Sequence, residues 1–251
     1  MSALRSSRLL VLLGAILVQL LLGTVYGYSI FWQPLQSDLG LEPTQANYAF
    51  AICILTFAVV MVLAGRVQDI LGPRIPAIIG AVLLGGGFLI ASQLQSKIVF
   101  YLAHAAFVGV VAVLLLMLFH AVFKNVDRDE YPIVQAIPSG ILATVITAGV
   151  VLGNQYVGQS GETDRLMMLW GTVGFLAGAG IGFAYVCPLA ALVKWFPDHK
   201  GLVSGVAVAG FGFGAYLFSN KDLPFSAETY LQDHSVTDLF FVHGLVALVV
   251  V

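Results

Sequence analysis

The stretch Gly182–Ala215 reads GFAYVCPLAALVKWFPDHKGLVSGVAVAGFGFGA and joins two apolar segments through a short polar turn, Lys194–Lys200. Trp195 stands where a helix would leave the hydrocarbon of a bilayer for the lipid headgroups, and Pro197 then ends that helix. Five glycines follow in the next segment, where they permit a second backbone to come close in lipid. This stretch predicts two membrane-spanning helices joined by a tight turn.

The composition places the whole chain in a membrane. Of its 251 residues, 59% are hydrophobic and only 10% are charged, and the mean hydropathy is +0.96. A soluble domain carries about 25% charged residues, so the class is an integral membrane protein. Arg5 and Arg8 precede an apolar run too long for a signal peptide, which predicts a retained first span. No nucleic-acid patch or metal-ligand cluster is evident, and we expect no cofactor and no metal.

Eight apolar segments follow one another along the chain. They are about Leu9–Phe31, Ala46–Ala64, Ile75–Ser92, Val99–Phe123, Ala136–Val157, Leu166–Val193, Leu202–Phe218 and a last one from Leu239 to Val251. A span needs about 20 residues, and the last segment has about 13. We therefore expect a truncated eighth span.

The basic residues predict the orientation of the spans. With the N-terminus in the cytoplasm, eight basic residues lie inside and three outside, as the positive-inside rule favours. The inside set is Arg5, Arg8, Arg66, Arg74, Lys124, Arg128, Lys194 and Lys200, and the outside set is Lys97, Arg165 and Lys221.

Three motifs occur in order: Tyr26–Phe31 before Pro34, then Gly65–Arg74 (GRVQDILGPR), then the Trp195 turn with its Lys-Gly and the later Ala-Gly-Phe-Gly-Phe-Gly. In these motifs the chain resembles the oxalate/formate antiporter family of the major facilitator superfamily, over roughly residues 10–95 and 168–251. The resemblance implies an all-α N-terminal six-helix half, here with an inserted two-helix hairpin.

The domain organisation follows from that resemblance. Residues 1–98 would form the first three helices, residues 99–165 the inserted hairpin, and residues 166–251 the remaining three helices, the last of them truncated. The hairpin is a peripheral packing element, or it has a regulatory or oligomerisation role. The resemblance also implies a missing C-terminal six-helix half, which in the family carries the basic residues that bind carboxylates.

Four aromatic residues are candidates for substrate binding. The resemblance places Tyr26, Tyr185 and Phe211 on the wall of a central cavity, and Tyr28 lies beside them in the sequence. A phenol donates a hydrogen bond to a carboxylate while its ring excludes water. The alternative is plain packing or an interfacial aromatic belt.

The segment Gly65–Arg74 matches the loop signature of the superfamily. The resemblance implies that this cytoplasmic loop latches the two halves of the transporter in one conformation. Asp69 would meet a helix N-terminus and basic groups, and the glycines would allow the tight path. The alternative is a solvated turn. The candidate latch residues are Gly65, Arg66, Asp69, Gly72 and Arg74.

Glycines at a spacing of four residues mark helix-packing faces, where backbones approach closely. They are Gly23 and Gly27 in the first segment, and Gly174, Gly178 and Gly182 in the sixth.

The spans are nearly free of ionisable side chains. No Asp, Glu, Lys or Arg lies well inside an apolar segment, which argues against proton symport driven from this half. We expect His104, His120 and His243 to be structural. The second segment has no side-chain amide over Ile52–Met61, unlike oxalate-transporting relatives, so a monocarboxylate is as plausible a substrate as oxalate.

These observations predict a secondary transporter of small organic anions such as oxalate, formate or lactate, working by antiport, and not an enzyme. The alternatives are a membrane-embedded half-carrier with a structural or regulatory role, and a superfamily transporter of another substrate. We expect an integral protein of a bacterial inner membrane, with the lipid bilayer and a small carboxylate as its partners and no nucleic acid. We do not expect the present chain to transport alone.

Overall fold

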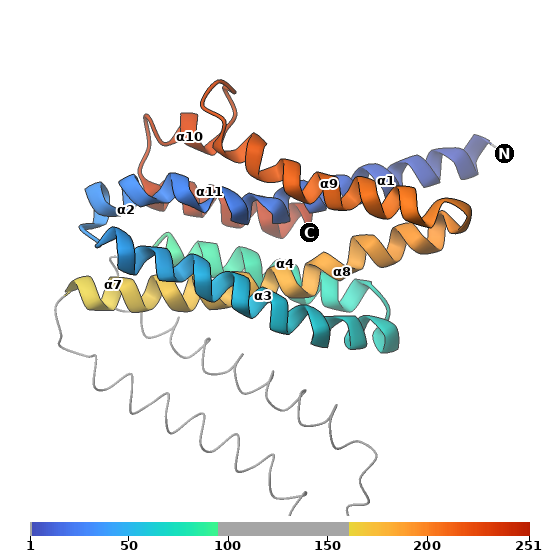
Figure 1. The fold of residues 1–251 in the computed structure, drawn as a ribbon, viewed down its shortest axis with the longest axis horizontal. Coiled ribbons are helices and arrows are strands. Elements are labelled where there is room, and N and C mark those ends of the chain that lie inside the picture. The colour runs from blue at the N-terminus through green and yellow to red at the C-terminus, as the bar shows by residue number, and fades with distance from the viewer. Residues whose placement is uncertain (1, 95–160) are drawn as a thin grey trace, which may run out of the picture.

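A computed structural model describes residues 2–94 and 161–251, and every regular element in these two ranges is a helix (Figure 1). In chain order they are α1 (Ser2–Gly23), the 3₁₀ helix η1 (Thr24–Phe31), α2 (Trp32–Leu39), α3 (Pro43–Leu71), α4 (Arg74–Ala91), α7 (Gly161–Leu169), the π-helical segment η2 (Trp170–Leu176), α8 (Ala177–Trp195), the 3₁₀ turn η3 (Pro197–His199), α9 (Lys200–Ser219), α10 (Ala227–Tyr230) and α11 (Val236–Val250). The predicted segments Val99–Phe123 and Ala136–Val157, with His104 and His120, lie outside the described residues.

Five helical stretches among the described residues are long and apolar enough to cross a membrane. They are Arg8–Leu39, Pro43–Leu71, Arg74–Ala91, Thr163–Trp195 and Pro197–Ser219, and α11 is a shorter apolar helix. A helix satisfies its own backbone hydrogen bonds, which is why it can cross hydrocarbon. The prediction of an all-α integral membrane protein is confirmed.

The first span extends beyond its predicted end at Phe31. The helix continues through η1 and α2 to Leu39. Pro34 does not end it, because the residue lies in the first turn of α2, where a missing N–H is tolerated. Gly40 ends α2 with a left-handed backbone (φ 64°) and donates its N–H to the Gln36 carbonyl at 3.0 Å.

The sixth predicted segment is a single long span made of α7, η2 and α8. It begins at Gly161, within the range that we assigned to the inserted hairpin. The tight turn predicted after it is present: α8 ends at Trp195, the short η3 follows, and α9 begins at Lys200.

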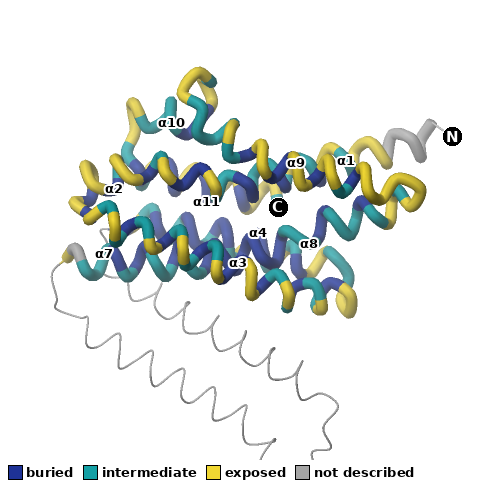
Figure 2. Tube along the Cα trace, viewed as in Figure 1, coloured by how far each residue is buried: buried dark blue, intermediate teal, exposed yellow. Residues whose placement is uncertain are grey.

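The bundle is arranged around α8. It packs against α3 and α4 along its length and against α1, while α4 packs against α11 and α1 against α9. Figure 2 shows buried positions concentrated on α4 and α8, with exposed positions on the outer turns of α1, α3 and α9. Segments far apart in the sequence therefore meet on α8.

Glycine lets α8 approach α3 closely. A Cβ added at Gly178 would lie 2.6 Å from the Cys53 carbonyl oxygen, and one at Gly182 would lie 2.9 Å from Val60 Cβ. At Gly174 the added atom would meet α3 at 3.1 Å. Any larger residue at these positions would push the two backbones apart.

A second close approach joins α1 to α9. A Cβ added at Gly23 would overlap the Phe211 carbonyl oxygen, and one at Gly214 would overlap the Leu20 carbonyl oxygen. At Gly27 the added atom would lie 2.9 Å from the Phe218 ring. Backbone meets backbone at the first two positions, so the packing of α1 on α9 requires glycine on both helices.

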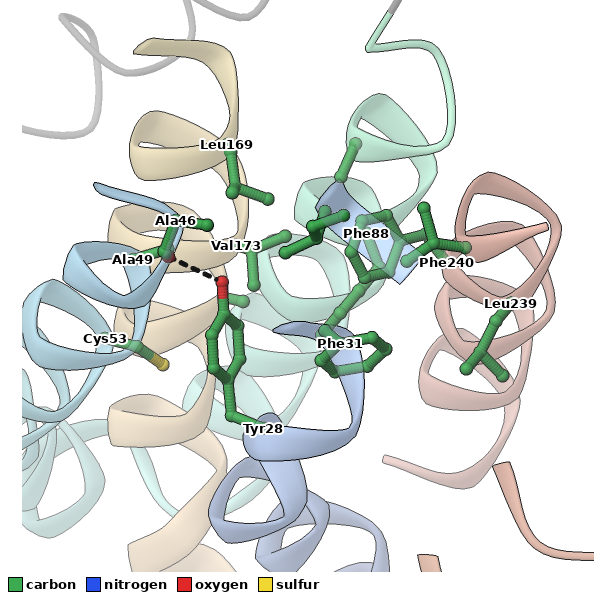
Figure 3. Close-up of a cluster of buried hydrophobic side chains, with 14 of the residues drawn as sticks. Tyr28, Phe31, Ala46, Ala49, Cys53, Phe88, Leu169, Val173, Leu239 and Phe240 are labelled. Atoms are coloured by element: carbon green, nitrogen blue, oxygen red, sulfur yellow. Dashed lines mark hydrogen bonds between the residues drawn. The ribbon is translucent and has the colours of Figure 1, made fainter. Parts of the chain in front are cut away.

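A large cluster of buried side chains surrounds Tyr28 (Figure 3). The Tyr28 hydroxyl donates a hydrogen bond to the Ala46 carbonyl oxygen at 2.9 Å. Its neighbour Phe31 contacts Phe240 of α11, with ring centroids 5.1 Å apart. The two cysteines of the chain, Cys53 and Cys187, are both buried and unpaired.

Candidate functional site

Three of the four predicted binding residues lie together in one aromatic cluster. Phe211 of α9 is at its centre, with ring centroids 5.5 Å from Tyr26 and 5.1 Å from Tyr185, both edge-on. Phe57 of α3 adds contacts with Tyr185 at 5.4 Å and with Phe211 at 6.0 Å. Phe50 contacts Tyr26 at 6.4 Å. We call these five residues the aromatic cluster.

The aromatic cluster is assembled from four segments. Tyr26 comes from η1, Phe50 and Phe57 from α3, Tyr185 from α8 and Phe211 from α9. Phe211 is 6% exposed, whereas Tyr26 is 50% exposed and Tyr185 is partly buried. The two phenols therefore lie toward the surface of the bundle, next to rings that exclude water. This arrangement places two hydroxyl donors beside an apolar surface formed by aromatic rings.

Tyr28 faces the core, and its ring stacks on Phe50 of the aromatic cluster with centroids 5.7 Å apart. It lies two residues beyond Tyr26 in η1, and a 3₁₀ helix has three residues per turn, so the two side chains leave different faces. Tyr28 is 4% exposed and its hydroxyl is bonded to Ala46, as Figure 3 shows. Its position is that of a core residue.

A buried amide lies next to the aromatic cluster. Gln19 of α1 is fully buried, and its Nε2 donates to the Tyr185 carbonyl oxygen at 3.4 Å. A carbonyl only accepts, so this contact fixes the amide orientation and makes Oε1 the remaining acceptor. That Oε1 is buried without a hydrogen-bond partner among the described residues. An unsatisfied acceptor in this environment is unfavourable, and it adds a polar group beside Tyr185.

The candidate latch residues lie mostly on a helix. Gly65, Arg66 and Asp69, which we expected in a loop, belong to α3, which continues to Leu71. The placement in a loop was wrong, because nothing between Ala64 and Gly72 breaks the hydrogen-bond ladder of the helix. Only Gly72 and Pro73 connect α3 to α4, and Gly72 has a left-handed φ of 78°. Arg74 is the first residue of α4.

The Asp69 carboxylate contacts the side chain of the preceding residue, Gln68. Gln68 is 9% exposed and its Nε2 lies 3.4 Å from Asp69 Oδ1, within hydrogen-bonding distance. The carboxylate thus stands at the C-terminal end of α3, at the same end of the bundle as the start of α4.

His243 was expected to be structural, and the structure gives it a polar partner. The imidazole lies on α11, 7% exposed, with Nε2 3.3 Å from the Thr24 hydroxyl. Thr24 is the first residue of η1, the segment that carries Tyr26. His243 thereby links α11 to η1.

Sequence reasoning missed Gln19, Phe57 and the Thr24–His243 contact. Gln19 is the only polar side chain in the apolar run from Leu9 to Gly23, which is a usable signal. No sequence signal marks Phe57, because a phenylalanine in an apolar segment looks the same whether or not it belongs to a site. The Thr24–His243 pair joins residues 219 positions apart, and only the packing of α11 brings them together.

Three known proteins with similar sequences are named as a transporter, a carrier and an antiporter. An uncharacterized MFS-type transporter of Escherichia coli (strain K12), YhjX, is 25% identical over 245 residues, which is 98% of this chain and 42% of that protein. The chain is a relative of major facilitator superfamily transporters. No protein-family model matches it.

Two further relatives match shorter regions at higher identity. The apicoplast pyruvate carrier 1 of Toxoplasma gondii is 43% identical over 81 residues, or 32% of this chain and 15% of the carrier. The oxalate:formate antiporter of Oxalobacter formigenes is 37% identical over 71 residues, or 28% of this chain and 16% of the antiporter. The chain spans less than half the length of the curated relatives that it matches.

Proposed function

We propose that this chain contributes one wall of a transport path for small carboxylates across a membrane. The observation that carries the proposal is the aromatic cluster, which places two phenol donors from η1 and α8 around Phe211. The names of two relatives, a pyruvate carrier and an oxalate:formate antiporter, support a carboxylate as the substrate class.

The aromatic cluster suits an anion that must lose its water. The Tyr26 and Tyr185 hydroxyls would donate to the carboxylate oxygens, while Phe57 and Phe211 exclude solvent behind them. A hydrogen bond to a charged group contributes about 1.5–3 kcal/mol, more than a bond between neutral groups. Neither phenol neutralises the charge of the anion. That part would fall to basic residues elsewhere in the complete protein, in the C-terminal half that the family has.

We further propose that transport is an exchange by alternating access. The bundle would rock against a second six-helix half of the kind that the family has, so that the aromatic cluster faces each side in turn. The close glycine contacts of α1 with α9 and of α8 with α3 would let these helices move as rigid pairs. The turn between α3 and α4, with Asp69 and Arg74 beside it, would latch one conformation.

The same proposal includes the orientation. The eight-to-three excess of basic residues supports a cytoplasmic N-terminus, and a bacterial inner membrane is the setting that the family resemblance suggests. The turn at Trp195–Lys200 and the Gly72–Pro73 connection would then both lie in the cytoplasm.

The test is exchange by the complete gene product in proteoliposomes. Vesicles are preloaded with unlabelled formate, lactate, pyruvate or oxalate, and uptake of the labelled carboxylate is followed. We expect uptake that requires preloading and that lactate inhibits but neutral lactamide does not. Uptake that needs no preload would contradict exchange. Absence of carboxylate uptake by a folded protein would overturn the substrate class.

A further inference from the structure

The side chain of Gln19 is enclosed by three helices of the bundle. It belongs to α1, and a Cβ added at Gly210 of α9 would lie 3.7 Å from its own Cβ. Its amide then reaches α8, where Nε2 donates to the Tyr185 carbonyl oxygen at 3.4 Å. Gly210 immediately precedes Phe211, whose ring contacts that of Tyr185 with centroids 5.1 Å apart. Gln19 therefore lies next to the backbones that carry two rings of the aromatic cluster.

Gln19 and Tyr26 lie on one face of the first span. Four α-helical and three 3₁₀ steps separate them, which together make about two turns. Gly23 lies between them on this face, against the Phe211 carbonyl. The amide and the Tyr26 phenol are therefore both directed toward the side of α1 that faces α9 and the aromatic cluster.

The amide has one hydrogen-bonding atom to spare. The Tyr185 carbonyl can only accept, so Nε2 is turned toward it and Oε1 remains as an acceptor. Oε1 is buried, and none of the described residues donates to it. A buried polar atom without a partner is unfavourable, and a bound molecule with a hydrogen-bond donor would relieve that cost. The site thus combines two phenol donors with one acceptor.

These groups match a carboxylate that also carries a hydroxyl. The phenols donate to carboxylate oxygens, and a 2-hydroxy acid such as lactate offers Oε1 a donor beside its carboxylate. Pyruvate, oxalate and formate carry only acceptors when ionised, so each would place lone pairs against those of Oε1. An ammonium group also donates, but a buried cation needs a counter-charge, and the neutral Gln19 provides none.

We propose that Gln19 is a specificity residue that makes the transport path prefer 2-hydroxy monocarboxylates to carboxylates without a hydroxyl. Oε1 accepts the hydrogen bond of the substrate hydroxyl while the phenols bind the carboxylate. Gln19 is fully buried in the conformation described here, so this contact forms once the aromatic side chains have moved to admit the substrate.

The inference rests on the proposed function and narrows its substrate class. It also separates this chain from the two relatives that are named for pyruvate and for oxalate and formate, because those anions have no hydroxyl donor.

The first test compares substrates of similar size on the wild-type protein. The complete gene product is reconstituted in vesicles preloaded with lactate, and uptake of labelled lactate is competed with unlabelled lactate, pyruvate or 2-fluoropropionate. The three share a carbon skeleton and a carboxylate, and only lactate has a donor hydroxyl. A site built to bond a hydroxyl rejects an analogue that lacks it, so lactate should compete at an about 10- to 100-fold lower concentration. Equal competition by all three, or uptake of pyruvate without uptake of lactate, overturns the inference while the proposed function stands.

The second test removes the acceptor. Gln19→Leu has no polar side-chain atom, so lactate should compete no better than pyruvate, because only lactate loses a hydrogen bond. This ratio distinguishes specificity from positioning: loss of the contact with the Tyr185 backbone alone would weaken both substrates equally. An equal loss for lactate and pyruvate, with the wild-type ratio kept, overturns the inference. The comparison of substrates on wild type decides the question independently of how well this variant folds.

The matched control is Gln36→Leu. Gln36 is an exposed amide of α2, at the other end of the same span, and the substitution is identical. This variant should keep the wild-type preference for lactate. A loss of preference as large as in Gln19→Leu would show that the ratio does not depend on the buried acceptor, which overturns the inference. Absence of any carboxylate uptake by folded wild-type protein overturns the proposed function and this inference with it.

Discussion

Tyr26 and Tyr28 stand two residues apart in η1 and have different environments. Tyr26 is half exposed and lies edge-on to Phe211, whereas Tyr28 is buried with its hydroxyl bonded to Ala46. The aromatic cluster and the core around Tyr28 thus lie on two sides of one short 3₁₀ segment, and Phe50 contacts both tyrosines. The difference shows that one short helical segment can present one tyrosine to the outside of the bundle while the hydroxyl of the other is used by the fold.

The largest effect is expected where the segment carrying both tyrosines is held against α9. Gly23→Ala should destabilise the fold by about 1–3 kcal/mol or more, because its Cβ overlaps the Phe211 backbone and the backbone cannot yield. Thermal unfolding in detergent, followed by size-exclusion chromatography, checks this. Gly14→Ala on the same helix is the control, since nothing lies within 4 Å of its Cβ. Equal stability of the two variants would show that α1 does not need this close contact.

Removing the Tyr185 phenol should act on transport rather than on the fold. Tyr185→Phe should lower carboxylate exchange by about 10- to 100-fold, the loss of one hydrogen bond to a charged group, and should leave the unfolding temperature near wild type. The control is Tyr216→Phe, an exposed tyrosine of α9 that stacks on Phe213 instead. A similar loss of exchange in both variants would show that transport does not depend on the aromatic cluster.

Replacing the buried amide of Gln19 should affect transport and stability differently. Gln19→Leu removes an acceptor that has no partner among the described residues, so the protein should be as stable as wild type or up to about 1–3 kcal/mol more stable. Exchange should fall, because the polar group next to Tyr185 is lost. Unfolding and uptake are measured on the same preparation. A marked loss of stability would mean that Oε1 has a partner outside the described residues.

The smallest effect is expected at Tyr28. Tyr28→Phe removes one hydrogen bond to a backbone carbonyl and should lower the free energy of unfolding by about 0.5–1.5 kcal/mol. Carboxylate exchange, measured at a temperature where both proteins are folded, should remain at the wild-type rate. Exchange that fell as far as in Tyr185→Phe would place Tyr28 in the transport path and remove the contrast between the two tyrosines.

Much of the fold could be read from the sequence, because hydrophobic runs of span length have few alternatives in a membrane. Helix ends were less predictable: Arg66 and Asp69 are polar, so the end of the hydrocarbon was mistaken for the end of α3. A helix can continue into water after it leaves lipid, and polarity alone does not mark its last turn.

The candidate site was predictable in part. Resemblance brought Tyr26, Tyr185 and Phe211 together, and the structure places them in contact. Residues two apart leave different faces of an α-helix and of a 3₁₀ helix alike, so spacing separates Tyr28 from Tyr26, but which of the two faces is buried depends on how the other helices pack. Gln19 was visible as a polar residue, but its unsatisfied oxygen depends on where α8 runs.

The two native cysteines make the protein a convenient one for chemical labelling. Cys53 and Cys187 are 3% and 6% exposed, so a bulky thiol reagent has little access to either in the folded bundle. One cysteine introduced at Tyr26 would then report alone, in an otherwise wild-type background. Its rate of alkylation from each side of the membrane would follow the opening of the path as substrate is added, and would give a reading of conformational populations that transport assays do not supply.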